Sequence, residues 1–138
     1  MSLLSRNLTL LAAFAGAATL GACAAQWSPE QQEAFARGDC FFVETVSGFA
    51  PGPNDQTVYL RAGVNDVYEL RTTGVCRDVN WTNQIGIRTR TGASSICTGF
   101  DAELLIPSFG GQPDRCPVIA QRRLSAEEVA ALPARSRP

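Results

Sequence analysis

The chain contains no histidine and no lysine among its 138 residues, so all twelve of its basic side chains are arginine. Without histidine, Ser-His-Asp and Cys-His catalytic arrangements are excluded, and the side chain that most often binds metals in proteins is missing. The formal net charge is only −1, whereas nucleic-acid-binding domains carry a marked basic excess. We therefore expect no nucleic-acid partner and none of the commonest hydrolase mechanisms.

The N-terminus has the pattern of an export signal. Arg6 precedes an apolar run over residues 8–20, and Leu20-Gly21-Ala22-Cys23 follows. This tetrapeptide resembles the lipobox of bacterial lipoproteins, which implies cleavage before Cys23 and acylation of that cysteine by a diacylglycerol and an amide-linked chain. Residues 1–22 would then be a signal peptide. Two alternatives stay open: an ordinary cleavage site at Ala22-Cys23-Ala24, or an uncleaved membrane helix, for which the run is weakly hydrophobic.

A lipidated Cys23 would hold the protein close to a membrane. Residues 23–28 form the anchor and tether, and the five steps from Cys23 to Ser28 span on the order of 17 Å when extended. Trp27 would either rest at headgroup level or pack on the domain. Ala24 after the lipidated cysteine implies outer-membrane sorting under the enterobacterial rule, with the domain facing the periplasm. The membrane is therefore an expected partner, through the anchor.

The other four cysteines predict two disulfides. Cys40, Cys76, Cys97 and Cys116 form an even set once Cys23 is set aside. No two of them are closely spaced as zinc ligands usually are, so we expect no metal site and no cofactor. Among the three connectivities we favour Cys76–Cys97 and Cys40–Cys116, which would join a loop to the next hairpin and the first strand to the last.

Helix signals stand at both ends of the mature domain. Ser28 followed by Pro29 predicts an N-cap and a first helical residue, with the helix ending before Gly38. Near the C-terminus, Ser125 is a second N-cap with an acidic residue at the third helical position. These patterns predict helices over residues 29–37 and 125–132. The domain is expected to cover residues 29–132, followed by a disordered tail over 133–138.

The segment between the helices has strand patterns separated by turn residues. TVYLR and VYELR flank AGVND and predict a hairpin; IGIRTR and SSICTGF flank TGA and predict another. CFFVETVSGF, AELLIP and CPVIAQRRL each predict a further strand. Six or seven short strands without βαβ alternation predict an all-β domain, a small antiparallel sandwich or barrel, with short terminal helices.

Five polar residues are candidates for ligand or partner contact. Asn65 and Asp66 fall in the first hairpin loop, where both residue types also favour turns. Arg88 and Arg90 would point outward together and suit anionic groups. Asp101 stands two residues before Glu103, a carboxylate pair of the kind that hydrolyses glycosides, although such pairs are more often solvated charges.

Several segments together resemble an uncharacterised family of small bacterial lipoproteins, known only as a domain of unknown function. The resemblance spans most of residues 38–132 and rests on CFFVETVSGF, GVNDVYEL, GVC, SSICTGFDAELLIP and RCPV. It implies one domain with four paired cysteines, and it brings no assigned activity.

The expected function is that of a non-enzymatic cell-envelope lipoprotein that binds a partner or supports envelope structure. A short tether limits the partner to the membrane surface, an envelope protein or nearby cell wall. The first alternative is an inhibitor of a secreted hydrolase, acting through residues 51–56 or 108–115. The second is a hydrolase that uses Asp101 and Glu103.

Overall fold

The structure is a computed structural model that describes residues 28–76, 79–80, 82–108 and 110–138. The predicted signal peptide, Cys23 and Trp27 lie outside the described residues. The order of the elements is α1 (Pro29–Ala36), β1 (Cys40–Phe42), a 3-10 turn η1 (Val43–Thr45), β2 (Val46–Pro51), β3 (Thr57–Ala62), β4 (Asp66–Thr72), β5 (Gly86–Thr89), β6 (Ser95–Cys97), β7 (Asp101–Ile106), β8 (Asp114–Arg123), α2 (Ala126–Ala131) and a 3-10 turn η2 (Ala134–Ser136). Over the described ranges, neither helix has the length and apolar character needed to span a bilayer.

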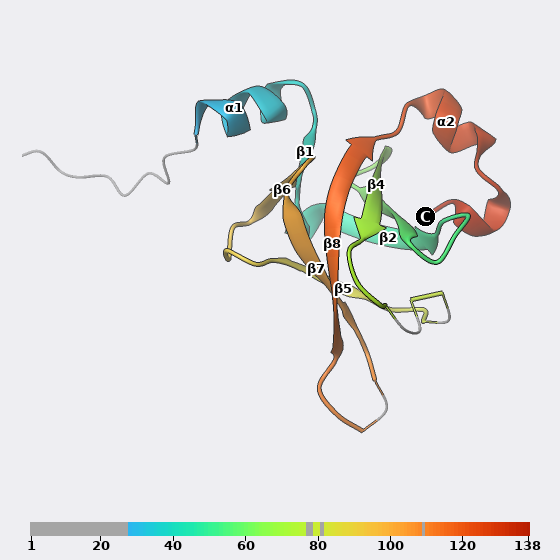
Figure 1. Ribbon diagram of the computed structural model, residues 1–138. Coiled ribbons are helices and arrows are strands. Elements are labelled where there is room, and N and C mark those ends of the chain that lie inside the picture. The colour runs from blue at the N-terminus through green and yellow to red at the C-terminus, as the bar shows by residue number, and fades with distance from the viewer. Residues whose placement is uncertain (1–27, 77–78, 81, 109) are drawn as a thin grey trace, which may run out of the picture.

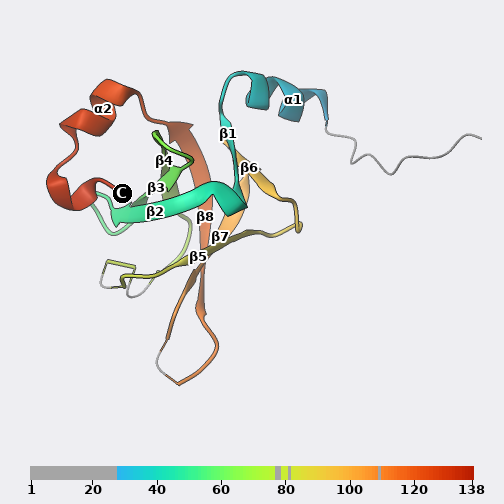
Figure 2. The same cartoon turned by 180° about the vertical axis from the view of Figure 1, so that it is seen from behind.

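Six strands form one antiparallel sheet in the order β2-β3-β4-β8-β7-β5, and β1 and β6 form a separate two-stranded ribbon. The large sheet curls into a half-barrel, with α1 beside the ribbon and α2 against the other side of the sheet (Figures 1 and 2). The predicted fold class, all-β with short terminal helices, is confirmed. The strand count is higher than predicted because η1 divides CFFVETVSGF in two: Thr45 Oγ1 donates to the Phe42 carbonyl at 2.7 Å and turns the chain from ribbon to sheet.

The core fills the concave side of the half-barrel. Alternate residues of each strand face it, as the period of two in a strand requires. Tyr68 and Leu70 of β4 face inward with Cys116, Val118 and Ala120 of β8. The ribbon closes one end of this core, since Phe41 and Ile96 are opposite one another and both are buried.

The two predicted hairpins have different outcomes. The β3–β4 hairpin is confirmed, with Leu60 opposite Tyr68. The second hairpin prediction is wrong, because β5 pairs with β7 and β6 pairs with β1. Ile96, the inward side chain of β6, packs against Phe41 of β1 rather than against β5, the strand that precedes it in the sequence.

The favoured disulfide pairing is also wrong, although all four domain cysteines are bridged. The bonds are Cys40–Cys97 and Cys76–Cys116. Cys40 and Cys97 are direct cross-strand partners in the ribbon, with Cα atoms 3.9 Å apart. The chain after β4 continues beside β8, where the Thr73 amide donates to the Pro117 carbonyl at 2.9 Å, and this brings Cys76 to Cys116.

Helix α2 covers part of the convex face of the sheet. Leu124 is buried with Tyr59 and Val67, and Val129 and Leu132 pack against them. The predicted cap is confirmed, since Ser125 Oγ accepts from the Glu128 amide and the Glu128 carboxylate accepts from the Ser125 amide.

The residues after α2 fold back on the sheet, so the prediction of a disordered tail over 133–138 is wrong. Arg137 donates from Nε to the Leu132 carbonyl and from Nη2 to the Ala130 carbonyl, both at 2.8 Å. These carbonyls at the end of α2 would otherwise lack intrahelical partners. Ser136 of η2 is buried at 2 % exposure, and η2 lies against β2.

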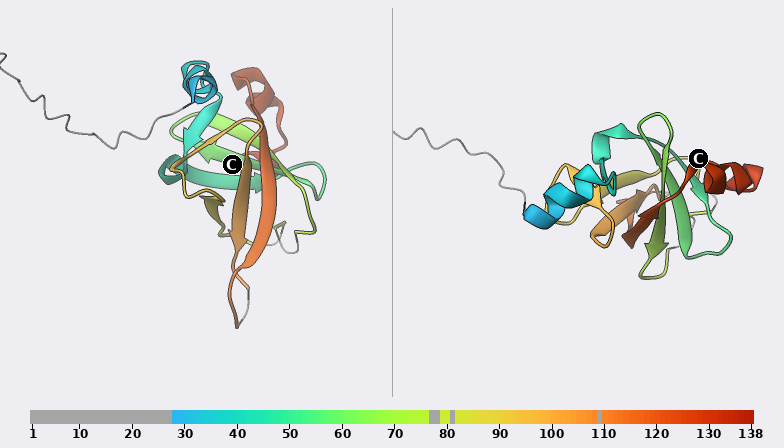
Figure 3. Two further views of the ribbon diagram at one scale, coloured as in Figure 1. Left: turned by 60° about the vertical axis from the view of Figure 1, so that its left-hand side comes forward. Right: turned by 90° about the horizontal axis from the view of Figure 1, so that it is seen from above.

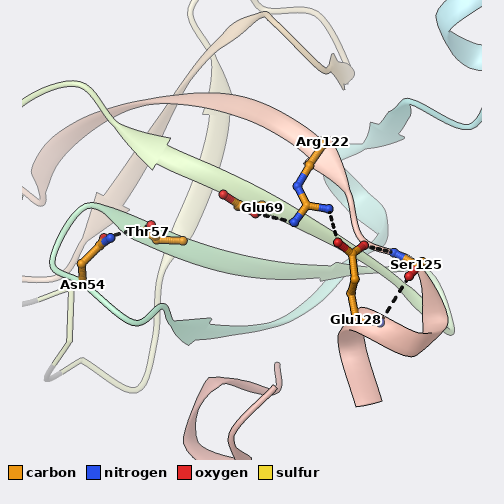
Figure 4. Close-up of polar contacts among 6 residues, drawn as sticks. All are labelled: Asn54, Thr57, Glu69, Arg122, Ser125 and Glu128. Atoms are coloured by element: carbon orange, nitrogen blue, oxygen red, sulfur yellow. Dashed lines mark hydrogen bonds and ion pairs between the residues drawn. The ribbon is translucent and has the colours of Figure 1, made fainter. Parts of the chain in front are cut away.

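A charged network links α2 to the sheet (Figure 4). Arg122 of β8 donates from Nη1 to Glu128 Oε1 at 2.7 Å, and its Nη2 lies 3.2 Å from Glu69 Oε2. The hydrogen bonds from the Ser125 amide and from Arg122 lower the pKa of the Glu128 carboxyl. Ionised Glu128 therefore stabilises both the start of α2 and its contact with β8.

This lowered pKa predicts a pH-dependent contribution to folding stability. A carboxyl with a folded-state pKa below its unfolded value of about 4.5 contributes fully above that pH. The contribution is lost as pH falls through the folded-state pKa. We expect Glu128→Gln, which keeps an acceptor for the Ser125 amide, to lose less stability than the wild type on acidification, as measured by urea denaturation. Glu127→Gln in the same helical turn is the control, and equal losses for Glu128→Gln and wild type would contradict the assignment.

Candidate functional site

A small pocket lies between the end of β5, strand β6 and the start of β7. Its volume is about 260 Å³, and its lining residues are Thr89, Arg90, Thr91, Ala93, Ser95, Ile96, Cys97, Phe100 and Asp101. Two of the candidate residues from the sequence, Arg90 and Asp101, therefore share one cavity. The pocket exists because β5 and β7 are paired while the chain between them leaves the sheet to form β6.

The wall over residues 97–101 is held by backbone hydrogen bonds. The Phe100 amide donates to the Cys97 carbonyl at 3.1 Å and closes a tight turn. Gly99 occupies this turn with φ +84°, a backbone conformation that residues with a Cβ atom rarely adopt. The Gly99 amide donates to the Ala120 carbonyl at 2.7 Å, and the disulfide from Cys97 fixes the start of the turn.

The opposite wall, over residues 89–95, is held by two further bonds. Thr89 Oγ1 donates to the Ala93 carbonyl at 2.7 Å, which closes the turn after β5. The Val43 amide donates to the Ser94 carbonyl at 2.9 Å, which ties the end of that turn to η1. Both walls are thus held by hydrogen bonds and a disulfide that leave the side chains of Arg90, Phe100 and Asp101 unused, and the pocket is preformed for a ligand.

The side chains of Arg90, Phe100 and Asp101 take no part in the bonds that hold the walls. Arg90 and Asp101 are exposed, and the described residues give neither of them an ion pair or a side-chain hydrogen bond. Phe100 is 43 % exposed, whereas Ile96 and Cys97, which also line the pocket, are buried. The pocket therefore offers a hydrogen-bond donor, an acceptor and an exposed aromatic ring.

Arg88 and Glu103 form an ion pair on the convex face rather than joining the pocket. Arg88 donates from Nε and Nη2 to Glu103 Oε2, at 2.8 and 2.6 Å. The hydrogen bond from Arg88 is the main cause that lowers the pKa of Glu103, and the charges of Arg88, Arg115 and Arg90 add to it. A carboxyl with a lowered pKa is ionised near neutral pH, so Glu103 is poorly suited to donate a proton beside Asp101.

Asn65 and Asp66 lie at a different place in the fold. Asn65 is in the turn between β3 and β4, and Asp66 begins β4. Asp66 Oδ1 lies 3.4 Å from Nη1 of Arg123 at the end of β8. Neither residue lines the pocket. Their described roles are a turn position and a surface ion pair.

The comparisons with known proteins give one match. A family model described as a family of unknown function, DUF6491, matches residues 6–137. The chain belongs to the DUF6491 family. The predicted resemblance to an uncharacterised domain is confirmed, and the family description carries no activity. No curated protein and no solved structure matches the chain.

Sequence reasoning missed the aromatic and hydroxyl residues of the pocket in this DUF6491 protein. The sequence pattern predicts Phe100 at the end of a strand and Thr91 and Ser95 within a hairpin. The local signal near Phe100 is the preceding Gly99, because a glycine at the end of a strand pattern predicts a turn. Among the described residues of the DUF6491 domain, no group of three or more acidic, Cys or His side chains is arranged to hold a metal ion.

Proposed function

We propose that this protein is a cell-envelope lipoprotein, anchored by Cys23 in the outer membrane and facing the periplasm, that presents a non-enzymatic binding domain. The observation that carries the proposal is the use of the cysteines. The two disulfides use four of the five cysteines, and the remaining one is Cys23 in the lipobox-like segment. Disulfides are typical of exported proteins, and a cysteine outside them is what acylation requires.

The pocket supports binding in preference to catalysis. Its walls are fixed by hydrogen bonds while Arg90, Phe100 and Asp101 remain available to a ligand. The chain has no histidine, and Glu103 is held as a carboxylate by Arg88. This arrangement favours recognition of a ligand over a reaction that needs proton transfer.

The position of α1 supports a site near the membrane. α1 begins a few residues after the proposed anchor and packs Ala34 and Phe35 on the Cys40–Cys97 disulfide of the ribbon. Strand β6 of this ribbon lines the pocket. Strand β6 therefore lies on the same side of the domain as α1, whereas the β7–β8 hairpin extends away from α1 (Figures 1 and 3). A tether on the order of 17 Å keeps the pocket close to the membrane surface.

In-cell cross-linking of the full-length protein, followed by mass spectrometry, tests this function. We expect one dominant envelope component, either a protein or cell-wall material, to be captured by the wild type. Cys23→Ser is the control, because an unanchored domain should lose a partner that is reached from the membrane. Turnover of a cell-wall substrate that Asp101→Asn abolishes without unfolding would contradict the proposal and indicate an enzyme.

A second candidate function, inhibition of a secreted hydrolase, is favoured by the loop between β2 and β3. Asn54 Oδ1 accepts from Thr57 Oγ1 at 2.9 Å (Figure 4). It also accepts from the Gln56 amide at 3.0 Å, and the two bonds fix this exposed loop. A rigid exposed loop suits insertion into an enzyme cleft at low entropic cost. Under this alternative, Asn54→Ala should weaken inhibition of the captured enzyme.

A further inference from the structure

We propose that the pocket over residues 89–101 binds one neutral sugar ring of a glycan, with Phe100 as the stacking surface and Arg90 and Asp101 as hydrogen-bond partners. The inference rests on the proposed binding function and names its ligand class. It is carried by the combination of an exposed ring, two unpaired side chains of opposite charge and a cavity with fixed walls.

The charges of the lining favour a ligand without net charge. Arg90 contributes one positive charge and Asp101 one negative charge, and no other lining residue is charged. Each hydroxyl of a sugar both donates and accepts a hydrogen bond. A guanidinium only donates and a carboxylate only accepts, so the two side chains can bind adjacent hydroxyls. Thr91 and Ser95 add hydroxyl groups, which can both donate and accept hydrogen bonds.

Phe100 offers an exposed aromatic ring to this ligand. Phe100 is 43 % exposed, in contrast to Phe41 at 4 % in the same region. The face of an aromatic ring is electron-rich, and the C–H hydrogens on one face of a pyranose carry partial positive charge. Stacking would remove apolar surface of Phe100 from water while the hydroxyls around the sugar ring reach Arg90 and Asp101.

The size and rigidity of the pocket limit the ligand to a single ring. A volume of about 260 Å³ lies just below the range of roughly 300–1,000 Å³ for drug-sized ligands. The fixed walls reduce the entropy that is lost on binding. Longer glycans would place one ring in the pocket and leave the next in solvent, so both cell-wall glycans and other polysaccharides are sources of this chemistry.

Saturation-transfer difference NMR on the full-length protein in detergent micelles tests the proposal. The probes are tri-N-acetylchitotriose, which has the N-acetylated ring of cell walls, and maltotriose, which lacks the acetyl group. Binding of either sugar supports the proposed sugar site. The sugar that binds more strongly shows whether the ligand comes from cell-wall glycans or from other polysaccharides. We expect Phe100→Ala, Asp101→Asn and Arg90→Gln each to weaken binding about tenfold or more, the usual loss for a stacking contact or a charged hydrogen bond. Phe100→Trp should retain binding. Val64→Ala and Asp114→Asn are exposed control substitutions that should have no effect.

Three results would overturn the proposal, provided that circular dichroism shows folded variants. They are no signal from either sugar, unchanged binding in Phe100→Ala, or pocket-dependent binding of the zwitterionic dipeptide D-alanyl-D-alanine in place of the sugars. If the sugars fail but cross-linking still captures an envelope component, the binding function stands and another surface performs it. If both experiments fail, the proposed function is wrong as well.

Discussion

Replacing Cys23 with serine is expected to move the protein from the membrane fraction to the soluble periplasm or to leave an unprocessed precursor. Three acyl chains on Cys23 would bind the bilayer with about 0.8 kcal/mol per buried CH₂ group, which makes attachment effectively permanent, whereas a single chain gives only marginal binding. Serine has no thiol to form the thioether. The change should therefore remove all three chains at once.

Membrane fractionation with intact-mass measurement checks this expectation. Wild-type protein should begin at Cys23 and carry the mass of the lipid. Gln26→Ser in the tether is the control and should keep both the membrane location and the added mass. A Cys23→Ser variant that still fractionates with the membrane at an unchanged mass would show that the lipobox interpretation is wrong. A wild type without lipid mass would favour the ordinary cleavage site.

Removing the Cys76–Cys116 bridge is expected to lower the free energy of unfolding by about 4 kcal/mol, the loop-entropy value for a bridge of this separation. The bridge spans 40 residues and the Cys40–Cys97 bridge spans 57, so the two entropic contributions are similar. Cys116 is also 1 % exposed and lies opposite Leu104 in the core. Cys76→Ser/Cys116→Ser therefore adds the cost of a buried hydroxyl.

Urea denaturation followed by circular dichroism measures this loss. Val64→Ala is the control, since it keeps the anchor and both bridges and changes a side chain that is 84 % exposed, and its unfolding free energy should equal that of the wild type. Peptide mapping without reduction gives an independent check of the pairing. Linked peptides should join residue 40 to 97 and residue 76 to 116, and a peptide that links 76 to 97 would contradict the structure.

Local signals in the sequence determined the elements whose partners are close along the chain. Ser125 and Glu128 cap α2 because both groups lie within one helical turn. The β3–β4 hairpin follows from two alternating segments and a short loop containing Gly63. The even set of four cysteines determined that all four are bridged. None of these inferences needed to know which distant segments meet.

Distant pairings were decided only by the tertiary structure. The alternation around Ile87 and Ile96 gives the face that each side chain presents, but it does not give the neighbouring strand. Ile96 lies opposite Phe41 and Ile87 lies opposite Leu104, because these pairings fill the core of one curled sheet. The disulfide partners followed from the same pairings.

The tail and the pocket show the same division. The composition of residues 133–138 predicts a disordered tail. Contacts with the sheet and with the end of α2 decided instead that Arg137 caps the helix and that Ser136 is buried. Arg90 and Asp101 were candidates from the sequence as separate residues. They share a pocket with Phe100 because β5 pairs with β7 while β6 leaves to join β1. Sequence periodicity reports the environment of each residue, whereas the packing of the whole core selects which segments become neighbours.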